Sequence, residues 1–273
     1  MSTAPPPGGT QRRAPYKGPA LRAAGRSAGE VAPNAPRCLN CASRSVCVVG
    51  RLAPAERERL APFILERAFR KGDVLQEQEC MSEQLRIVKI GTTLLLRRGI
   101  SGQRSVIAVS GRGQTLGVLA LLGAREILDC HGASAGRLCE VGLEAVRRQG
   151  LADDRFLLAL AAQEVAALAR MADWAQLVHL RSMHRRLLVA LRLLAAEQGS
   201  SCVRIPSRTL LAELLGTTRE TVTRSLGTLV RARDVVRRDR WHYEVRDMGE
   251  VRDLGEARVD ALPGGPPERS ASS

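Results

Sequence analysis

The chain has 273 residues, of which 44% are hydrophobic and 26% are charged, a balance typical of a soluble globular protein with one or two domains. The longest apolar runs, such as residues 116–122, are far shorter than the ~20 residues that cross a bilayer, so we exclude a membrane span. The formal charge of +14 suits a polyanionic partner such as nucleic acid, and an odd count of seven cysteines argues against a disulfide scaffold.

The two ends of the chain have the composition of disordered tails. Residues 1–36 are rich in proline and glycine and contain few large apolar side chains, so they cannot bury enough surface to offset chain entropy. Residues 251–273 are similar in composition. The first 20 residues lack the apolar segment of a secretory signal, which predicts a cytoplasmic protein with reduced thiols.

Three cysteines follow the first tail as a C-x2-C-x5-C cluster at Cys38, Cys41 and Cys47. Zinc and iron-sulfur centres are both commonly held by four thiolates, so this cluster needs a fourth ligand. Cys130, beside His131, is one candidate. The four histidines show no paired metal-binding spacing, and we interpret Cys80, Cys130 and Cys202 as packing residues.

Residues 37–150 contain the cysteine arm and a predicted β-barrel sensory domain. Short runs rich in valine, isoleucine and leucine, such as LRIVKIG and SVIAVSG, are bounded by glycine and indicate successive strands of a small barrel or jelly roll. A helix over 54–65, with Pro54 in its first turn, is predicted to precede the strands.

Residues 151–182 change to helical periodicity. Asp153 or Asp154 can cap a helix of about 39 Å that extends from Arg155 to Leu180. Its apolar residues form two stripes, one of Leu157, Leu160, Met171, Trp174 and Val178, the other of Leu158, Val165, Leu168, Ala172 and Ala175. The two stripes suit a helix packed against both the barrel and a second copy of itself, although a single helix buried in its own core fits the periodicity equally well.

Residues 183–250 contain the pattern of a winged helix-turn-helix. Ala212 permits close approach of two helices, Gly216 supplies the positive φ of the turn, and a second helix buries Val222, Leu226 and Leu229. Thr217 or Thr218 begins that helix, and Thr217 with Glu220 fits a capping box. Two short strands, 235–237 and 241–245, predict the wing.

The exposed side of the second helix carries Arg219, Glu220, Thr223 and Arg224. Arginine can donate two hydrogen bonds to the O6 and N7 of guanine. Glutamate can accept a hydrogen bond from the cytosine amino group, and threonine can contact the thymine methyl group. An exposed charged face usually means only solvation, but these residues cluster where a recognition helix enters the major groove. The chain contains no nucleophile-base grouping and no glycine-rich phosphate loop, so we predict no enzyme activity.

Over about residues 38–250 the sequence resembles the Crp/Fnr family of transcription regulators, and within it the Fnr-type iron-sulfur sensors. The resemblance is carried by the C-x2-C-x5-C arm, by KGDVLQEQE and LRIVKIG in the barrel, and by LGTTRETVTRSLG in the recognition helix. It implies an α+β protein with an N-terminal β jelly-roll barrel of the cyclic-nucleotide-binding type, a long dimerisation helix and a C-terminal winged helix-turn-helix. Cys139, in RLCEVG, falls where the family's fourth cluster ligand lies, and we prefer it to Cys130.

The resemblance further implies a 4Fe-4S cluster on Cys38, Cys41, Cys47 and Cys139 that senses oxygen or redox state by controlling dimerisation and DNA binding. The implied partners are a palindromic DNA operator, a second copy of the chain and RNA polymerase. Cyclic AMP is not expected, because LGVLALLGAREILDCHGAS lacks the family's glutamate and arginine-serine/threonine pair. Zinc or a thiol-disulfide switch at the same cysteines remains an alternative, as does an iron-sulfur redox protein.

Overall fold

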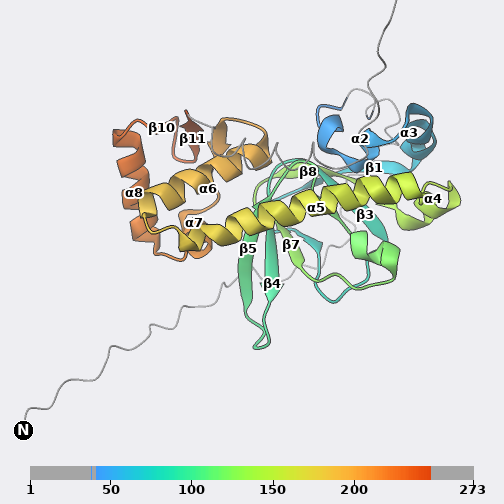
Figure 1. The fold of residues 1–273 in the computed structure, drawn as a ribbon, viewed down its shortest axis with the longest axis horizontal. Helices are drawn as coiled ribbons and strands as arrows, with labels where there is room; N and C mark the ends of the chain where they lie inside the picture. Colours follow the sequence, from blue (N-terminus) through green and yellow to red (C-terminus); the bar gives the residue numbers. More distant parts are fainter. Residues whose placement is uncertain (1–37, 39–40, 247–273) are drawn as a thin grey trace, which may run out of the picture.

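A computed structural model describes Cys38 and residues 41–246 of the chain (Figure 1). The predicted tails, 1–36 and 251–273, lie outside the described residues. The described part has the predicted mixed architecture of two antiparallel sheets, a long helix and a helix-turn-helix unit with a small sheet. Within it, no helix combines the length and the apolar character that a membrane span requires.

Short helices connect the cysteine arm to the barrel. They are η1 (Arg44–Val46), α2 (Val48–Arg51), α3 (Pro54–Leu60) and η2 (Ala61–Phe63). The prediction of one helix over 54–65 is wrong at its C-terminal end, because α3 stops at Leu60 and a strand begins at Ile64. Ile64 and Leu65 pair with Val141 and Glu140 of a distant strand, and this pairing overrides the local helical pattern.

Two four-stranded antiparallel sheets form the barrel. The first has the order β1 (Ile64–Phe69), β8 (Gly136–Gly142), β3 (Gln84–Ile90), β6 (Thr115–Leu116), and the second the order β2 (Val74–Gln76), β7 (Asp129–Gly132), β4 (Thr93–Arg98), β5 (Arg104–Ser110). Successive side chains of a strand face opposite sides, so Leu138 of β8 is buried inside the barrel while Cys139 lies on the outer face of the first sheet.

Helix α5 (Asp154–Gln176) runs past the barrel to the helix-turn-helix unit and ends in η4 (Leu177–His179) (Figure 1). Two shorter elements, η3 (Val118–Leu122) and α4 (Leu143–Arg148), precede it. Of the two predicted caps, Asp153 is the N-cap of α5, since its carboxylate accepts a 2.9 Å hydrogen bond from the N–H of Phe156. At 1.5 Å per residue, the 23 residues of α5 span about 35 Å.

The two predicted stripes of α5 differ in burial. The buried stripe contains Phe156, Leu160, Gln163, Ala167 and Trp174. Leu157 of α5 and Val178 of η4 were predicted in it but are 40% and 44% exposed. The second stripe is exposed, with Leu158, Val165 and Leu168 more than half accessible.

The C-terminal unit places three helices around a three-stranded sheet. Its elements are α6 (Met183–Gln198), β9 (Cys202–Arg204), α7 (Arg208–Leu214), α8 (Arg219–Arg231), β10 (Val235–Arg237) and β11 (His242–Val245). Strand β10 has its predicted bounds, and β11 starts one residue later than predicted because Trp241 still belongs to the turn. The third strand, β9, was not predicted and pairs with β11.

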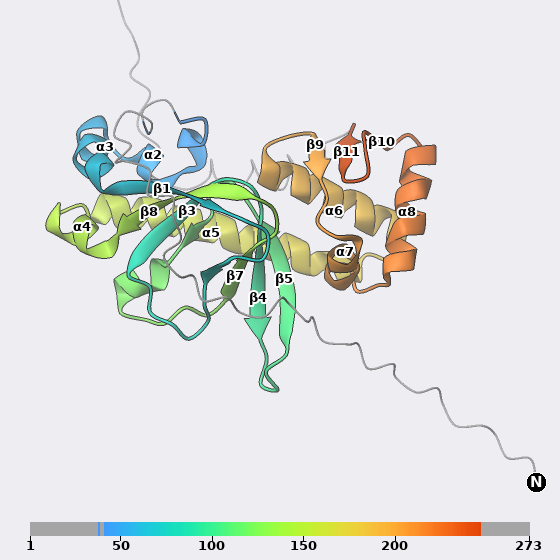
Figure 2. The same ribbon diagram turned by 180° about the vertical axis from the view of Figure 1, so that it is seen from behind.

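Two hydrophobic clusters hold these parts together. One fills the barrel and continues through Trp174 and Leu177 into the C-terminal unit. The other lies between the outer face of the first sheet and helices α2 to α5, and includes Val48, Ile87 and Phe156. Figure 2 shows the strands β1, β3 and β8 of that sheet from behind. The cysteine arm therefore has its own core, separate from the core of the C-terminal unit.

Candidate functional site

The turn between α7 and α8 has the geometry that the sequence predicts. Gly216 has φ +61°, and Ala212 is 5% exposed at the contact between the two helices. The N–H of Gly216 donates to the carbonyl of Glu213, and the N–H of Thr217 donates to the carbonyl of Ala212 at 2.9 Å. Only glycine adopts this left-handed conformation without a steric penalty, so the residue fixes the angle between the helices.

The predicted capping box of Thr217 and Glu220 is wrong. Thr218 is the N-cap of α8, and its hydroxyl accepts from the N–H of Thr221 at 3.2 Å. The N–H of Thr217 is used to close the preceding turn, so the helix begins one residue later. Sequence spacing alone did not distinguish the two adjacent threonines.

Helix α8 buries Val222, Leu226 and Leu229, as predicted. Arg219, Glu220, Thr223 and Arg224 are all exposed on its N-terminal turns. The hydroxyl of Thr223 donates to the carbonyl of Arg219 at 2.9 Å, which occupies its polar group and leaves its methyl for an apolar contact. The N-terminal turns of the helix thus expose two guanidinium groups, one carboxylate and one methyl group to solvent.

The tip of the wing is a rigid, basic turn. The carboxylate of Asp239 accepts from the N–H groups of Trp241 and His242 and from Nδ1 of His242, and these hydrogen bonds lower the pKa of Asp239 to about 2. The guanidinium of Arg240 lies 5.0 Å from the centre of the Trp241 ring, and Arg238 pairs with Glu244. This turn holds two arginines at the exposed end of the sheet.

The cysteine arm lies against the first barrel sheet. The hydroxyl of Ser43, which is 4% exposed, donates to the carbonyl of Lys89 on β3 at 2.8 Å. On β8, Cys139 pairs in register with Glu66 of β1 and Ile87 of β3. Cys38, Cys47 and Cys139 all pack against the second hydrophobic cluster. The fold thus brings residues 92 positions apart in the sequence, Cys47 and Cys139, to one patch.

The four predicted ligands interact electrostatically with one another. Burial raises the pKa of the Cys139 thiol to about 12, with further contributions from Cys38 and Cys47. Burial and then Cys41 raise the pKa of Cys38. Among the described residues, however, no three histidine, cysteine, aspartate or glutamate side chains form a metal-binding group.

Cys47 occupies a special position as the N-cap residue of α2. Burial raises the pKa of its thiol, and the N–H groups of Gly50 and Val49 oppose this rise by donating to the sulfur. These N–H groups would stabilise a thiolate at Cys47, the form in which cysteine binds metals.

Two cations lie beside the thiols, and neither was singled out from the sequence. Lys89 interacts with Cys41 and Cys139, and its Nζ is 2.7 Å from Oε2 of Glu66. Arg57, 5% exposed, interacts with Cys38 and donates to the carbonyl of Gly50 at 3.0 Å. Ile87 of β3 pairs with Cys139, and Lys89 lies two residues farther along the strand, at an irregularity between Val88 and Ile90, so its place beside the thiols depends on strand pairing rather than on sequence spacing.

Three further cysteines were predicted to be packing residues. Cys130 is fully buried in the barrel core and interacts with Thr93 rather than with the arm, which removes it as a rival fourth ligand. The prediction is wrong for Cys80 and Cys202, which are exposed. Cys80 lies in the loop after β2, and Cys202 points outward from β9 while its neighbour Val203 is buried.

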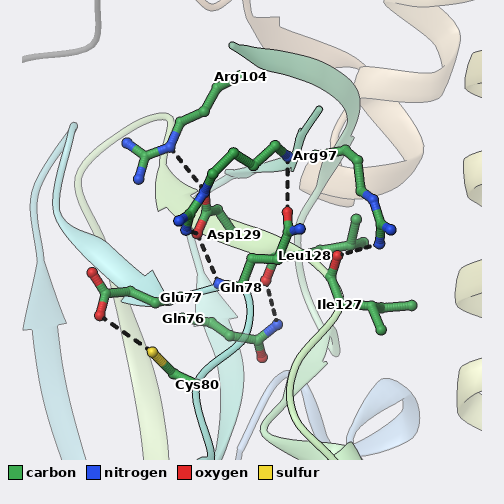
Figure 3. Close-up of polar contacts among 10 residues, drawn as sticks. Gln76, Glu77, Gln78, Cys80, Arg97, Arg104, Ile127, Leu128 and Asp129 are labelled. Carbon is green, nitrogen blue, oxygen red and sulfur yellow. Dashed lines mark hydrogen bonds and ion pairs between the residues drawn. The ribbon is translucent and has the colours of Figure 1, made fainter. Parts of the chain in front are cut away.

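A cavity of about 450 Å³ opens beside β2 and β3. Its lining includes Glu77, Glu83, Glu126 and one cation, Arg86, whose Nε is 2.9 Å from Glu140. Figure 3 shows the neighbouring polar network, in which buried Asp129 accepts from the N–H of Gln78 at 2.8 Å and pairs with Arg104 at 2.9 Å. The cavity has an excess of carboxylates, which disfavours a phosphate ligand.

Comparisons with known proteins agree with this architecture. The model of the Crp-like helix-turn-helix domain matches residues 185–254. No curated protein matches the chain significantly in sequence. Among solved structures, FixK2 of Bradyrhizobium japonicum is 19% identical with a TM-score of 0.58, over 70% of this chain and 96% of that one.

Two other structures are similar. The regulator CLP of Xanthomonas campestris, described as responsive to c-di-GMP, is 17% identical with a TM-score of 0.54, over 71% of this chain and 100% of that one. A Crp/Fnr-family transcriptional regulator of Thermus thermophilus is 21% identical with a TM-score of 0.51, over 71% and 99%. At these identities the likeness concerns the fold. The chain therefore carries a Crp-like helix-turn-helix domain within the overall fold of the Crp/Fnr regulators.

Proposed function

We propose that this protein is a homodimeric, DNA-binding transcription regulator rather than an enzyme. The observation that carries the proposal is the Crp-like domain with Arg219, Glu220, Thr223 and Arg224 exposed on the N-terminal turns of α8. In a helix-turn-helix protein these turns enter the major groove, where the two arginines read guanines, Glu220 reads cytosine and Thr223 contacts a thymine methyl. Arg238 and Arg240 on the wing then contact phosphates.

The exposed stripe of α5 supports the dimer. Three large aliphatic side chains, Leu158, Val165 and Leu168, are 61%, 55% and 66% exposed along one face of the helix. Pairing this face with the same face of a second copy buries it and gives a twofold-symmetric molecule. Twofold symmetry predicts a palindromic operator with half-sites about one helical turn apart.

We infer that the cysteine arm is the sensor. Cys38, Cys41, Cys47 and Cys139 are soft ligands of the type that hold a 4Fe-4S cluster, which supplies an oxygen- and redox-sensitive centre when bound. Their mutual interactions, the N–H groups at Cys47 and the cations Lys89 and Arg57 support this assignment. Three of these cysteines belong to the arm and the fourth belongs to β8, so a cluster that binds all four would draw the arm toward the first sheet.

The proposal extends to partners and location. We place the protein in the cytoplasm, where thiols stay reduced, and we propose RNA polymerase as its protein partner. Cyclic AMP is not proposed as a ligand, because the cavity beside β2 and β3 is lined by carboxylates and its Arg86 is paired with Glu140.

Iron and sulfide assays on anaerobically purified protein, with gel-shift titration against a selected palindromic site, test the function. We expect about four irons per chain, tight DNA binding in that state and loss of both in Cys139→Ala. Cys202→Ala, which changes an exposed cysteine on β9 of the C-terminal unit, is the matched control. The sensing proposal is contradicted if the wild type binds DNA equally well with and without oxygen and Cys139→Ala binds as well as the wild type. Zinc in place of iron supports the alternative of a zinc or thiol switch. An iron-sulfur protein without specific DNA affinity supports the redox-protein alternative.

A further inference from the structure

The turn between β5 and β6, residues 111–114, contacts three parts of the molecule that the proposed function assigns to different tasks. We propose that this turn, through Arg112, couples the cysteine arm to the helix-turn-helix unit. The inference rests on the proposed function of the arm and names the residues by which its state reaches the DNA-binding surface.

The first contact of the turn is with the C-terminal end of α6. The N–H of Arg112 donates to the carbonyl of Glu197 at 3.1 Å, and the N–H of Gly111 donates to the Glu197 carboxylate. That carboxylate is also 3.1 Å from Nε of Arg170 on α5. A Cβ at Gly111 would lie 2.1 Å from the carbonyl oxygen of Glu197, so the two backbones touch with no space for a side chain.

The second contact is with the cysteine arm. Nη2 of Arg112 donates to the carbonyl of Ala42 at 3.0 Å, and Ala42 directly follows Cys41. Gly113 has φ +84°, and a Cβ there would lie 2.3 Å from the carbonyl oxygen of Val46, which directly precedes Cys47. The turn therefore touches the backbone beside two of the four candidate ligands.

The third contact is with the long helix. The side-chain amide of Gln163, which is 5% exposed, donates to the carbonyl of Gly113 and, at 2.7 Å, to the hydroxyl of Thr115. The guanidinium of Arg112 also lies against Gly199, where a Cβ would be 2.4 Å from Nη1. Arg112 thus bridges the arm and the helix-turn-helix unit with one side chain.

These contacts leave little room for independent motion. Gly111 and Gly113 abut backbone atoms of the C-terminal unit and of the arm, and closely packed backbone does not absorb a displacement as a flexible side chain does. When the arm moves to gather its thiols, Ala42 and Val46 move with it. The turn then shifts against Glu197 and biases the position of α6 relative to α5.

The matched variants are Arg112→Ala and Arg97→Ala. Arg97 likewise donates to a backbone carbonyl, that of Ile127 at 2.7 Å, but the contact joins two segments of the barrel (Figure 3). We expect both variants to assemble the cluster as the wild type does. The backbone contacts of Gly111 and Gly113 remain in Arg112→Ala, so the ratio of DNA affinities with and without cluster should fall by at least about twofold in this variant and keep its wild-type value in Arg97→Ala. A wild-type ratio in Arg112→Ala overturns the proposal.

A second measurement uses the metal-free protein, so that failure of the sensor proposal and failure of the coupling can be distinguished. Ser43→Ala loosens the arm by removing its hydrogen bond to Lys89, without touching the turn or a cysteine. Hydrogen exchange of residues 195–199 should quicken in Ser43→Ala, and adding Ser43→Ala to Arg112→Ala should give no further change. Additive effects, or no response of these amides to Ser43→Ala, contradict the coupling whether or not a cluster is ever bound.

Discussion

The helix-turn-helix unit and the cysteine arm solve different physical problems. In the unit, the residues that would read DNA lie within six positions on one helix, Arg219 to Arg224, and their placement follows from one buried face and one turn. In the arm, the four candidate ligands span 102 positions, from Cys38 to Cys139, and meet only because β8 lies between β1 and β3. A contiguous site can thus be inferred from periodicity, whereas a dispersed site depends on strand register.

The largest expected effect is on stability, and it tests whether the helix-turn-helix unit and the cysteine arm have separate hydrophobic cores. Leu226→Ala removes a 2% exposed side chain from the core of the helix-turn-helix unit and should destabilise that unit by about 2–5 kcal/mol. Denaturant unfolding followed by hydrogen exchange measures the loss. Because the arm packs on the other cluster, the thiol reactivity of Cys38 and Cys47 should change much less than hydrogen exchange in the helix-turn-helix unit, and changes of equal size in both regions would contradict separate cores.

The pH dependence of the free energy of unfolding tests whether Glu197 is buried where the barrel turn meets the C-terminal unit. Burial raises the pKa of Glu197 from 4.5 to about 7, so its protonated form is favoured in the folded state. The stability from this group is present below pH 4.5 and lost as the pH rises to about 7. Glu197→Gln does not titrate, so wild type should lose about 3 kcal/mol of stability relative to the variant across that window in urea unfolding.

A second buried carboxyl group, that of Glu164, contributes to the same pH dependence. Burial also raises the pKa of Glu164 on α5 to about 7, so this carboxyl group titrates in the same pH range as Glu197. Glu197→Gln should therefore keep the part of the pH dependence that belongs to Glu164. An identical profile for wild type and Glu197→Gln would show that the junction does not bury this carboxylate.

The reading of DNA by α8 predicts a smaller and purely local effect. Arg224→Ala should weaken specific binding by about 1–3 kcal/mol and relax the preference at one base pair, because one bidentate contact is lost. Arg231→Ala, at the far end of the same helix, removes an equal charge and is the control. Competition binding against a randomised operator measures the DNA affinity and base preference of each variant. Equal losses of affinity in the two variants would indicate that Arg224 contacts a phosphate and not a base.

The smallest effect concerns the cap of the recognition helix. Thr218→Ala removes the hydroxyl that accepts from the N–H of Thr221 and should cost about 1 kcal/mol of stability, whereas Thr217→Ala should cost less. Thermal unfolding of the two variants decides between the observed cap and the capping box expected from the sequence.

Much of the helix-turn-helix unit was predictable because its signals are local. Gly216, the buried face of α8 and strand β10 follow from turn chemistry and residue periodicity, as the cap of α5 outside the unit follows from the two adjacent aspartates. The errors were also local ambiguities resolved by partners: Ile64 joined β8 instead of α3, and Thr217 closed a turn instead of starting a helix.

The succession of barrel strands, long helix and helix-turn-helix follows from local patterns, since each element depends on a repeat of two or about four residues along the chain. The folded chain was needed to show that Cys139 faces the arm, that Lys89 and Arg57 lie beside the thiols, and that Arg112 bridges Ala42 and the end of α6. Strand register and the close approach of glycine backbones join residues far apart in the sequence, and no local repeat specifies these contacts.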